Sequence, residues 1–158
     1  MRKLLFSLMG LVLAAPAYAL PINSPVPTNA YISFDGLDWA WGGPCPYSGG
    51  CFATGDLTYQ STQGWRLPTT AELSAIPTNF ANDFVFAGAN VPLGGSDPVS
   101  GATFTGSPPA AAACATPYFN TAATWCDWGD GASGDWAGAP GSGSFAEQLY
   151  VRGAAVPE

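Results

Sequence analysis

Glycine and proline constrain this chain more than any other feature of its sequence. Twenty Gly and fifteen Pro are spread over 158 residues. Glycine weakens a helix because it loses the most backbone entropy on folding, and an internal proline removes a hydrogen bond and clashes with the preceding turn. Long helices are therefore disfavoured, and we expect short strands, many turns and one or two short helices.

Residues 1–19 have the three parts of a secretory signal. Arg2 and Lys3 form a charged start, residues 4–13 are apolar, and residues 17–19 form an Ala-x-Ala cleavage site. The apolar segment is too short to span a bilayer, which takes roughly twenty residues. We therefore expect an exported chain with no membrane span in its mature part.

The charge of the mature chain limits its partners. Removal of the signal would leave two cations, Arg66 and Arg152, against eleven acids, a formal charge of −9. Such a surface repels nucleic acid and anionic lipid. The six tryptophans argue against disorder, because disordered chains are poor in aromatic residues. The sequence thus predicts one folded, acidic domain.

The four cysteines all lie beyond the predicted signal, at Cys45, Cys51, Cys114 and Cys126. An even number of cysteines in an exported chain favours disulfides, and three pairings are open. We favour Cys45 with Cys51 and Cys114 with Cys126, because short loops close at low entropic cost. A zinc site is the weaker alternative, because the chain has no histidine and no Cys-x-x-Cys spacing.

Two segments are predicted to be strands and one a helix. Apolar and polar residues alternate at the end of 31–41 and again over 145–152, as in half-buried strands. Thr69 followed by Glu72 forms a capping box, so a helix should begin near Thr70. The helix should end after about two turns, because proline cannot continue it and residue 77 is Pro.

The chain is expected to hold a single domain over residues 31–153. Residues 20–30 contain three prolines and should form an extended lead-in, and residues 154–158 should form a C-terminal tail. Residues 88–113 are rich in Gly, Ala, Pro, Ser and Thr, which predicts a long surface excursion. Its scattered apolar anchors would be Val91, Leu93, Val99 and Phe104.

Three motifs carry a resemblance: Gly-Leu-Asp-Trp at 36–39, Gly-Trp-Arg-Leu-Pro-Thr-Thr-Ala-Glu-Leu at 64–73, and Leu-Tyr-Val-Arg at 149–152. In these the chain resembles the Lcl C-terminal family of bacterial exported domains, whose fold is similar to C-type lectins and formylglycine-generating enzymes. The resemblance implies an α+β, C-type-lectin-like domain with short antiparallel sheets, one or two short helices and long Gly/Pro-rich loops. It also implies that the first and last strands pair.

The last residues carry a second resemblance. The run from Val151 to Glu158 is similar to the approach to the Pro-Glu-Pro signal of exosortase-sorted proteins, which continue through an apolar helix into a basic tail. This implies an extracellular or outer-surface location on a bacterium, as surface or matrix material.

Four tryptophans are candidate ligand-binding residues. Trp39 and Trp41 should share one face of a strand, where they either belong to the core or form a stacking platform for a flat ligand such as a sugar ring. Trp128 and Trp136 flank an acidic loop and are candidates to line a sugar site. Trp65 precedes the predicted helix and is expected in the core.

Asp127, Asp130 and Asp135 lie among glycines in that acidic loop. Carboxylates together with inward-turned carbonyls suit calcium, although the spacing is not that of an EF-hand. The alternative is a solvated acidic turn. Calcium is the single cofactor that the sequence suggests.

Catalysis is disfavoured by what the chain lacks. With no histidine it has no Ser–His or Cys–His pair, which removes the commonest hydrolase designs. Asp35 and Asp38 could in principle serve as the carboxylate pair of a glycoside hydrolase, but a turn before a strand explains them better. The copper and reactive cysteine pair of formylglycine-generating enzymes are not carried over, because nothing around the four cysteines matches that site.

We therefore expect a non-catalytic exported domain that serves adhesion or matrix assembly at the cell surface. The alternative is a glycan-binding, lectin-like module, with or without calcium, and a carboxylate-based glycoside hydrolase is a remote third. The expected partners are extracellular polysaccharide or surface proteins.

Overall fold

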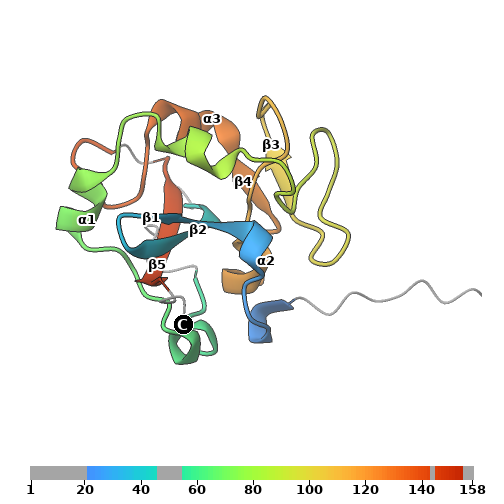
Figure 1. Cartoon of the computed structure of the whole chain (residues 1–158), viewed down its shortest axis with the longest axis horizontal. Helices are drawn as coiled ribbons and strands as arrows, with labels where there is room; N and C mark the ends of the chain where they lie inside the picture. The colour runs from blue at the N-terminus through green and yellow to red at the C-terminus, as the bar shows by residue number, and fades with distance from the viewer. Residues whose placement is uncertain (1–20, 46–54, 143–144, 155–158) are drawn as a thin grey trace, which may run out of the picture.

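The computed structural model describes residues 21–45, 55–142 and 145–154 and has an α+β architecture (Figure 1). Within these described residues, five short strands and three short α-helices are joined by 3-10 turns and long loops. The elements, in chain order, are η1 (Pro21–Asn23), η2 (Thr28–Ala30), β1 (Tyr31–Phe34), β2 (Leu37–Pro44), η4 (Gln60–Gln63), α1 (Thr70–Ala75), η5 (Phe80–Phe84), β3 (Thr103–Thr105), α2 (Thr116–Phe119), β4 (Trp125–Asp127), α3 (Trp128–Ser133) and β5 (Glu147–Gly153).

The main sheet has three antiparallel strands in the order β1-β2-β5. A tight turn at Asp35 and Gly36 joins β1 to β2, and both residues have positive φ (50° and 73°). Asp and Gly tolerate this backbone region better than other residues, which explains the turn. The last strand thus returns to pair with the N-terminal hairpin, and β2 becomes the central strand.

A second, smaller sheet pairs β3 with β4 in parallel. The disulfide between Cys114 and Cys126 ties the start of α2 to β4, with 6.0 Å between the two Cα atoms. This pairing is the one predicted from loop length. The predicted Cys45–Cys51 pair includes Cys51, which lies outside the described residues.

Helix α1 begins where the capping box places it. The Thr69 hydroxyl accepts from the Glu72 amide, and the Glu72 carboxylate accepts from the Thr69 amide. One side of this short helix is buried through Leu73. The predicted start and length are therefore confirmed.

Aromatic rings fill the space between the main sheet and the helices. Trp41 lies at the centre of this packing, with its ring centroid 4.9 Å from that of Trp136, 5.4 Å from Phe84 and 5.3 Å from Phe104. Burying one large apolar side chain contributes about 1.5–3 kcal/mol, so such a cluster gives a domain poor in regular structure a substantial core.

Three expectations need correction. Strand β2 is buried on both faces, not one, because Trp39 and Trp41 pack into one hydrophobic cluster and Ala40, which points to the other face, packs into a second. Residues 21–30, expected to be extended, form two 3-10 turns joined by an irregular segment. In the predicted excursion, Val91 is buried and Phe104 half-buried, but Leu93 and Val99 are 61% and 67% exposed and anchor nothing.

In the described part of the chain, no helix has the length and apolar character needed to cross a membrane.

Candidate functional site

The four tryptophans predicted to bind a ligand are all buried. Trp39, Trp41 and Trp136 expose at most 2% of their surface, and Trp128 exposes 9%. Trp41 and Trp128 are stacked, with ring centroids 5.9 Å apart, so they fill the core rather than face solvent. The core alternative is therefore the correct one for the Trp39/Trp41 pair, and no stacking platform forms there. Trp65 is also buried, as predicted.

The acidic loop of Asp127, Asp130 and Asp135 has a structural role. Asp127 caps α3, because its side chain accepts from the Gly129 amide at 2.9 Å. The pKa of Asp130 is raised by burial and by the charges of the other two carboxylates. Among the described residues, no three Asp, Glu, Cys or His side chains gather so as to hold a metal ion. The structure therefore does not bring these carboxylates together as the predicted calcium site.

Glu147 is a buried acid that the sequence analysis missed. Its side chain is fully buried on β5; Oε2 accepts from the Trp41 indole, and Oε1 has no partner. Burial raises the pKa of Glu147 to about 8, and the neighbouring charges of Asp127 and Asp130 add to this shift. The sequence contained a signal for this burial. Glu147 lies two residues before Leu149 and four before Val151, so along a strand its side chain points to the same face as these two buried residues.

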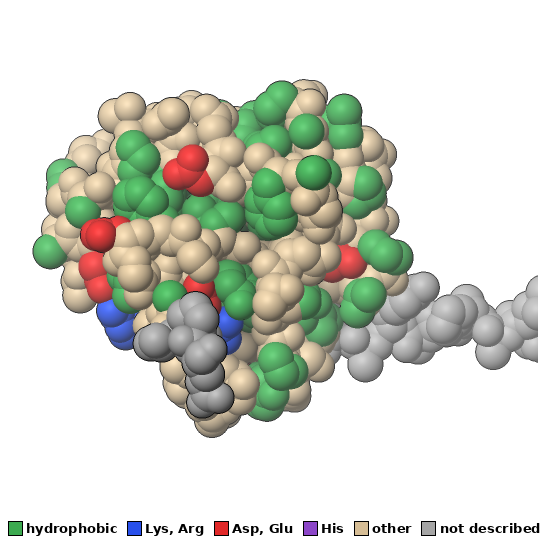
Figure 2. All heavy atoms as spheres, viewed as in Figure 1, with side chains coloured by type: hydrophobic (Ala, Val, Ile, Leu, Met, Phe, Trp, Pro, Cys, Tyr) green, Lys and Arg blue, Asp and Glu red, His purple; other side chains and the backbone are tan. Residues whose placement is uncertain are grey.

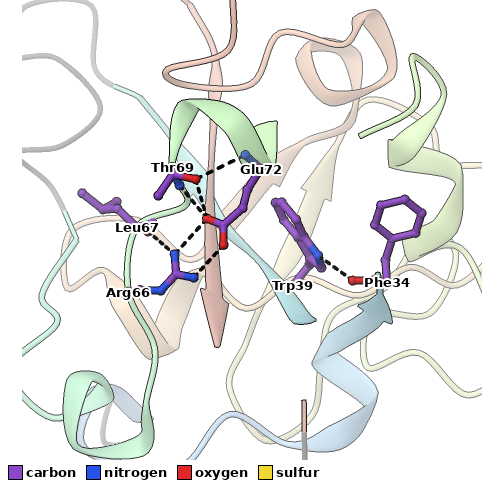
Figure 3. A network of polar contacts seen from close by, with 6 residues as sticks. All are labelled: Phe34, Trp39, Arg66, Leu67, Thr69 and Glu72. Carbon is purple, nitrogen blue, oxygen red and sulfur yellow. Dashed lines mark hydrogen bonds and ion pairs between the residues drawn. The ribbon is translucent and has the colours of Figure 1, made fainter. Parts of the chain in front are cut away.

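The two arginines of the described chain are both engaged within the fold. Arg66 makes two hydrogen bonds to Glu72, at 2.9 and 2.6 Å, and the carboxylate also accepts from Thr69 (Figure 3). Arg152 pairs with Asp38 at 2.9 Å and lies 4.5 Å from the centroid of the Trp65 ring. Each arginine is thus paired with a carboxylate of the fold, and neither is left free to bind an anionic ligand.

Asp38 is not available for the glycosidase pair considered with Asp35. One of its oxygens accepts from Arg152 and the other from the Ser33 hydroxyl, at 2.7 Å. It is buried in the sheet, whereas Asp35 is exposed in the hairpin turn.

Two surface hollows, each of about 330 Å³, flank the aromatic core. We call the first the long-loop hollow; it lies between residues 91–95 and 103–108. It is lined by Val91, Pro92, Leu93, Gly94, Gly95, Thr103, Phe104, Gly106, Ser107 and Pro108. We call the second the helix hollow; it lies between the end of α1 and residues 133–140. It is lined by Leu73, Ser74, Ile76, Pro77, Thr78, Ser133, Gly134, Trp136, Ala139 and Pro140.

Neither hollow is lined by a charged residue, although the whole chain has a formal charge of −7. In Figure 2 the blue, basic side chains lie at the lower left of the face shown, and green, hydrophobic side chains are scattered over the whole face, including its upper right, where Figure 1 places the β3 loops. A polyanion would find no free cation among the described residues, and an uncharged partner would not have to displace water from a charged group.

No protein-family model, curated protein or solved structure matches the chain. A function has to be inferred from the geometry of this uncharged surface.

Proposed function

We propose that this chain is a non-catalytic exported domain that serves adhesion or matrix assembly by binding an uncharged surface. The observation that carries the proposal is the composition of the long-loop side. Between residues 84 and 126 the single charged residue is Asp97, which is buried. Leu93 and Val99, two large apolar side chains of this segment, are exposed. They give an uncharged partner apolar surface to contact in a segment that exposes no charge.

The length of this segment supports a binding role. Loops longer than about 12–15 residues are uncommon in compact domains unless they are functional or disordered. Here residues 88–113 contain a single short strand, β3, yet they are joined to the rest of the fold by the pairing of β3 with β4, by a bridge from Val85 to Ala112, and by a hydrogen bond from the Asn90 amide to the Asn29 carbonyl. A long segment that is held in place, and not loose, is what a binding surface requires.

The carboxylates favour a non-catalytic role. The carboxylate of Asp38 is hydrogen-bonded to Arg152 and Ser33, and the side chain of Glu147 is fully buried. A glycoside hydrolase needs two accessible carboxyl groups facing one substrate, roughly 5–9.5 Å apart. Neither Asp38 nor Glu147 is accessible to a substrate in this structure, so neither can serve as one of these two carboxyl groups.

We also propose that the fold is C-type-lectin-like and that the chain belongs with the exported domains it resembles. The pairing of β5 with the N-terminal hairpin supports this, as does the short helix α1 directly after the Trp-Arg-Leu-Pro motif. The predicted export signal at residues 1–19 and the resemblance of residues 151–158 to the tails of exosortase-sorted proteins support a location outside the cytoplasm, at the cell surface or in its matrix.

The test is retention of the secreted chain, without residues 1–19, on intact cells and on extracted extracellular matrix, with calcium and with a chelator. We expect saturable binding that the chelator does not change, with no release of reducing sugar. Binding lost on chelation would restore the calcium alternative at Asp127, Asp130 and Asp135. Absence of binding to every cell and matrix fraction would overturn the proposal, and so would turnover of a glycan substrate.

A further inference from the structure

The long-loop hollow has the size and lining of a small ligand site. Its volume of about 330 Å³ lies at the lower end of the range for ligand pockets, about 300–1,000 Å³. The half-buried ring of Phe104 contributes an aromatic surface, and it is backed by the rings of Trp41 and Trp128 at 5.3 and 6.2 Å. Leu93, which is 61% exposed, adds apolar surface to the wall.

A buried polar network holds the loop that forms one wall. The Asn90 amide donates to Asp97 at 3.0 Å and to the Cys114 carbonyl at 2.9 Å, and it accepts from the Cys114 amide at 3.0 Å. Asp97 also accepts from the Ser100 hydroxyl and from the Val99 amide. The loop is thus joined to the residue that forms the Cys114–Cys126 disulfide, and it needs little further ordering when a ligand binds.

Glycines let a ligand approach the backbone at this hollow. Gly94 and Gly106 line it and have positive φ, 68° and 85°. A Cβ added at Gly94 would meet no atom within 4 Å, so a ligand can reach the backbone of Gly94 from that direction. The hydroxyls of Thr103 and Ser107 supply side-chain donors and acceptors beside these backbone groups.

We propose that the long-loop hollow binds one uncharged sugar ring of a neutral extracellular polysaccharide. The inference rests on the proposed function and names the ligand class. A neutral sugar ring has an apolar C–H face, which suits Phe104 and Leu93. Its edge of hydroxyl groups suits Thr103, Ser107 and the glycine backbone. A charged sugar is disfavoured, because no charged side chain lines the hollow to offset its loss of solvation.

The helix hollow is a poorer candidate for the same ligand. Its aromatic residue, Trp136, is only 2% exposed, and the indole N–H is buried without a partner. A sugar ring could reach neither the face of that ring nor its donor unless the core opened. The hydroxyls of Ser74 and Ser133 already donate to backbone carbonyls of their own helices.

The experiment compares two acidic substitutions in the same loop. Leu93→Asp places a charge in the wall of the long-loop hollow. Val99→Asp makes the same change six residues away, at a position that is 67% exposed and does not line this hollow. The probes are dextran, mannan and a neutral galactan, with alginate as the anionic polymer. Binding of the secreted chain is measured by affinity electrophoresis and titration calorimetry in the presence of a chelator.

We expect at least one neutral polymer to bind, at least a tenfold loss of affinity in Leu93→Asp, and less than a twofold change in Val99→Asp. Ser107→Arg, which fills the hollow from the opposite wall, should match Leu93→Asp. Both positions are exposed, so folding should be retained, and near-ultraviolet circular dichroism checks this.

Two results would overturn the inference and leave the proposed function standing: retention on cells or matrix without binding to any of the probe polymers, and equal effects of the Leu93 and Val99 changes. Binding only to alginate would overturn both, because the proposed function is binding to an uncharged surface. Absence of binding to every polymer, cell and matrix fraction would instead overturn the proposed function, and the inference with it.

Discussion

Two glutamates, one at the surface and one in the core, have opposite surroundings. Glu72 lies on α1 at the surface, where Arg66 and the Thr69 amide and hydroxyl hydrogen-bond its carboxylate. These bonds lower the pKa of Glu72 to about 2, and Arg66 makes the largest contribution. Glu147 lies in the core, where burial raises its pKa to about 8. The same residue type is thus held ionised in one place and protonated at neutral pH in the other.

The difference teaches how local and non-local contacts act on stability. The partners of Glu72 are within six residues along the chain, whereas Trp41, which donates to Glu147, is 106 residues away. The surface pair should stabilise the fold at neutral and mildly acidic pH. The buried acid should stabilise it less as the pH rises. Each of the following experiments separates these two contributions.

The largest expected effect comes from ionising Glu147. Its folded-state pKa, about 8, is above the ordinary value of 4.5, so between these values the native state retains a proton that the unfolded chain has lost. The free energy of unfolding should therefore fall as the pH rises from about 4.5 to 8, by on the order of 3–5 kcal/mol. Urea unfolding followed by tryptophan fluorescence at a series of pH values measures this fall.

Glu147→Gln is the matched control, because glutamine has nearly the same shape but does not titrate. The difference between wild type and variant should change across this pH window and remain constant outside it. Parallel pH profiles in the two proteins would show that Glu147 is ionised at neutral pH and that its burial is incomplete.

The next largest effect tests the cover over the buried acid. A Cβ at Gly131 on α3 would overlap the ring of Trp41, the residue that donates to Glu147. Overpacking of this kind costs about 1–3 kcal/mol, so Gly131→Ala should be destabilising despite the better helix propensity of alanine. Gly153→Ala, where a Cβ meets nothing within 4 Å, should change the urea midpoint little. Equal midpoints in the two variants would contradict the packing of α3 on Trp41.

The features that sequence could predict are the local ones. The capping box of α1 and the Cys114–Cys126 loop are both closed by short stretches of chain, and both are confirmed. The role of Trp39 and Trp41 was not settled, because alternation shows which residues share a face but not whether another layer covers it. The long-loop hollow was not predicted, because its two walls, residues 91–95 and 103–108, are held near each other by the bridges Ser96–Thr103 and Val91–Ala112, which no local pattern encodes.

A smaller effect separates the two functions of Glu72. Its pKa is depressed, so the stability it contributes is present above about 4.5 and is lost as the pH falls towards 2. Glu72→Ala removes both the cap and the ion pair and should cost about 1–1.5 kcal/mol, because the pair is partly exposed and screened. Glu72→Gln can keep the cap and should cost about 0.5 kcal/mol. Equal costs for the two variants, measured by urea unfolding at pH 6, would mean that the cap contributes nothing.

The smallest effect concerns the geometry of the surface pair. Arg66→Lys keeps the charge but replaces a two-pronged contact with a single ammonium group, so it should cost about 0.3–0.5 kcal/mol. The side chain of Arg66 is 47% exposed, and 1 M NaCl should therefore bring wild type and variant together, because the Debye length falls to about 3 Å. The effect of Glu147→Gln at pH 8 should persist in the same salt, since mobile ions do not enter the core. A salt-dependent Glu147 effect would mean that solvent reaches this carboxylate, and the contrast between the two glutamates would then be one of degree.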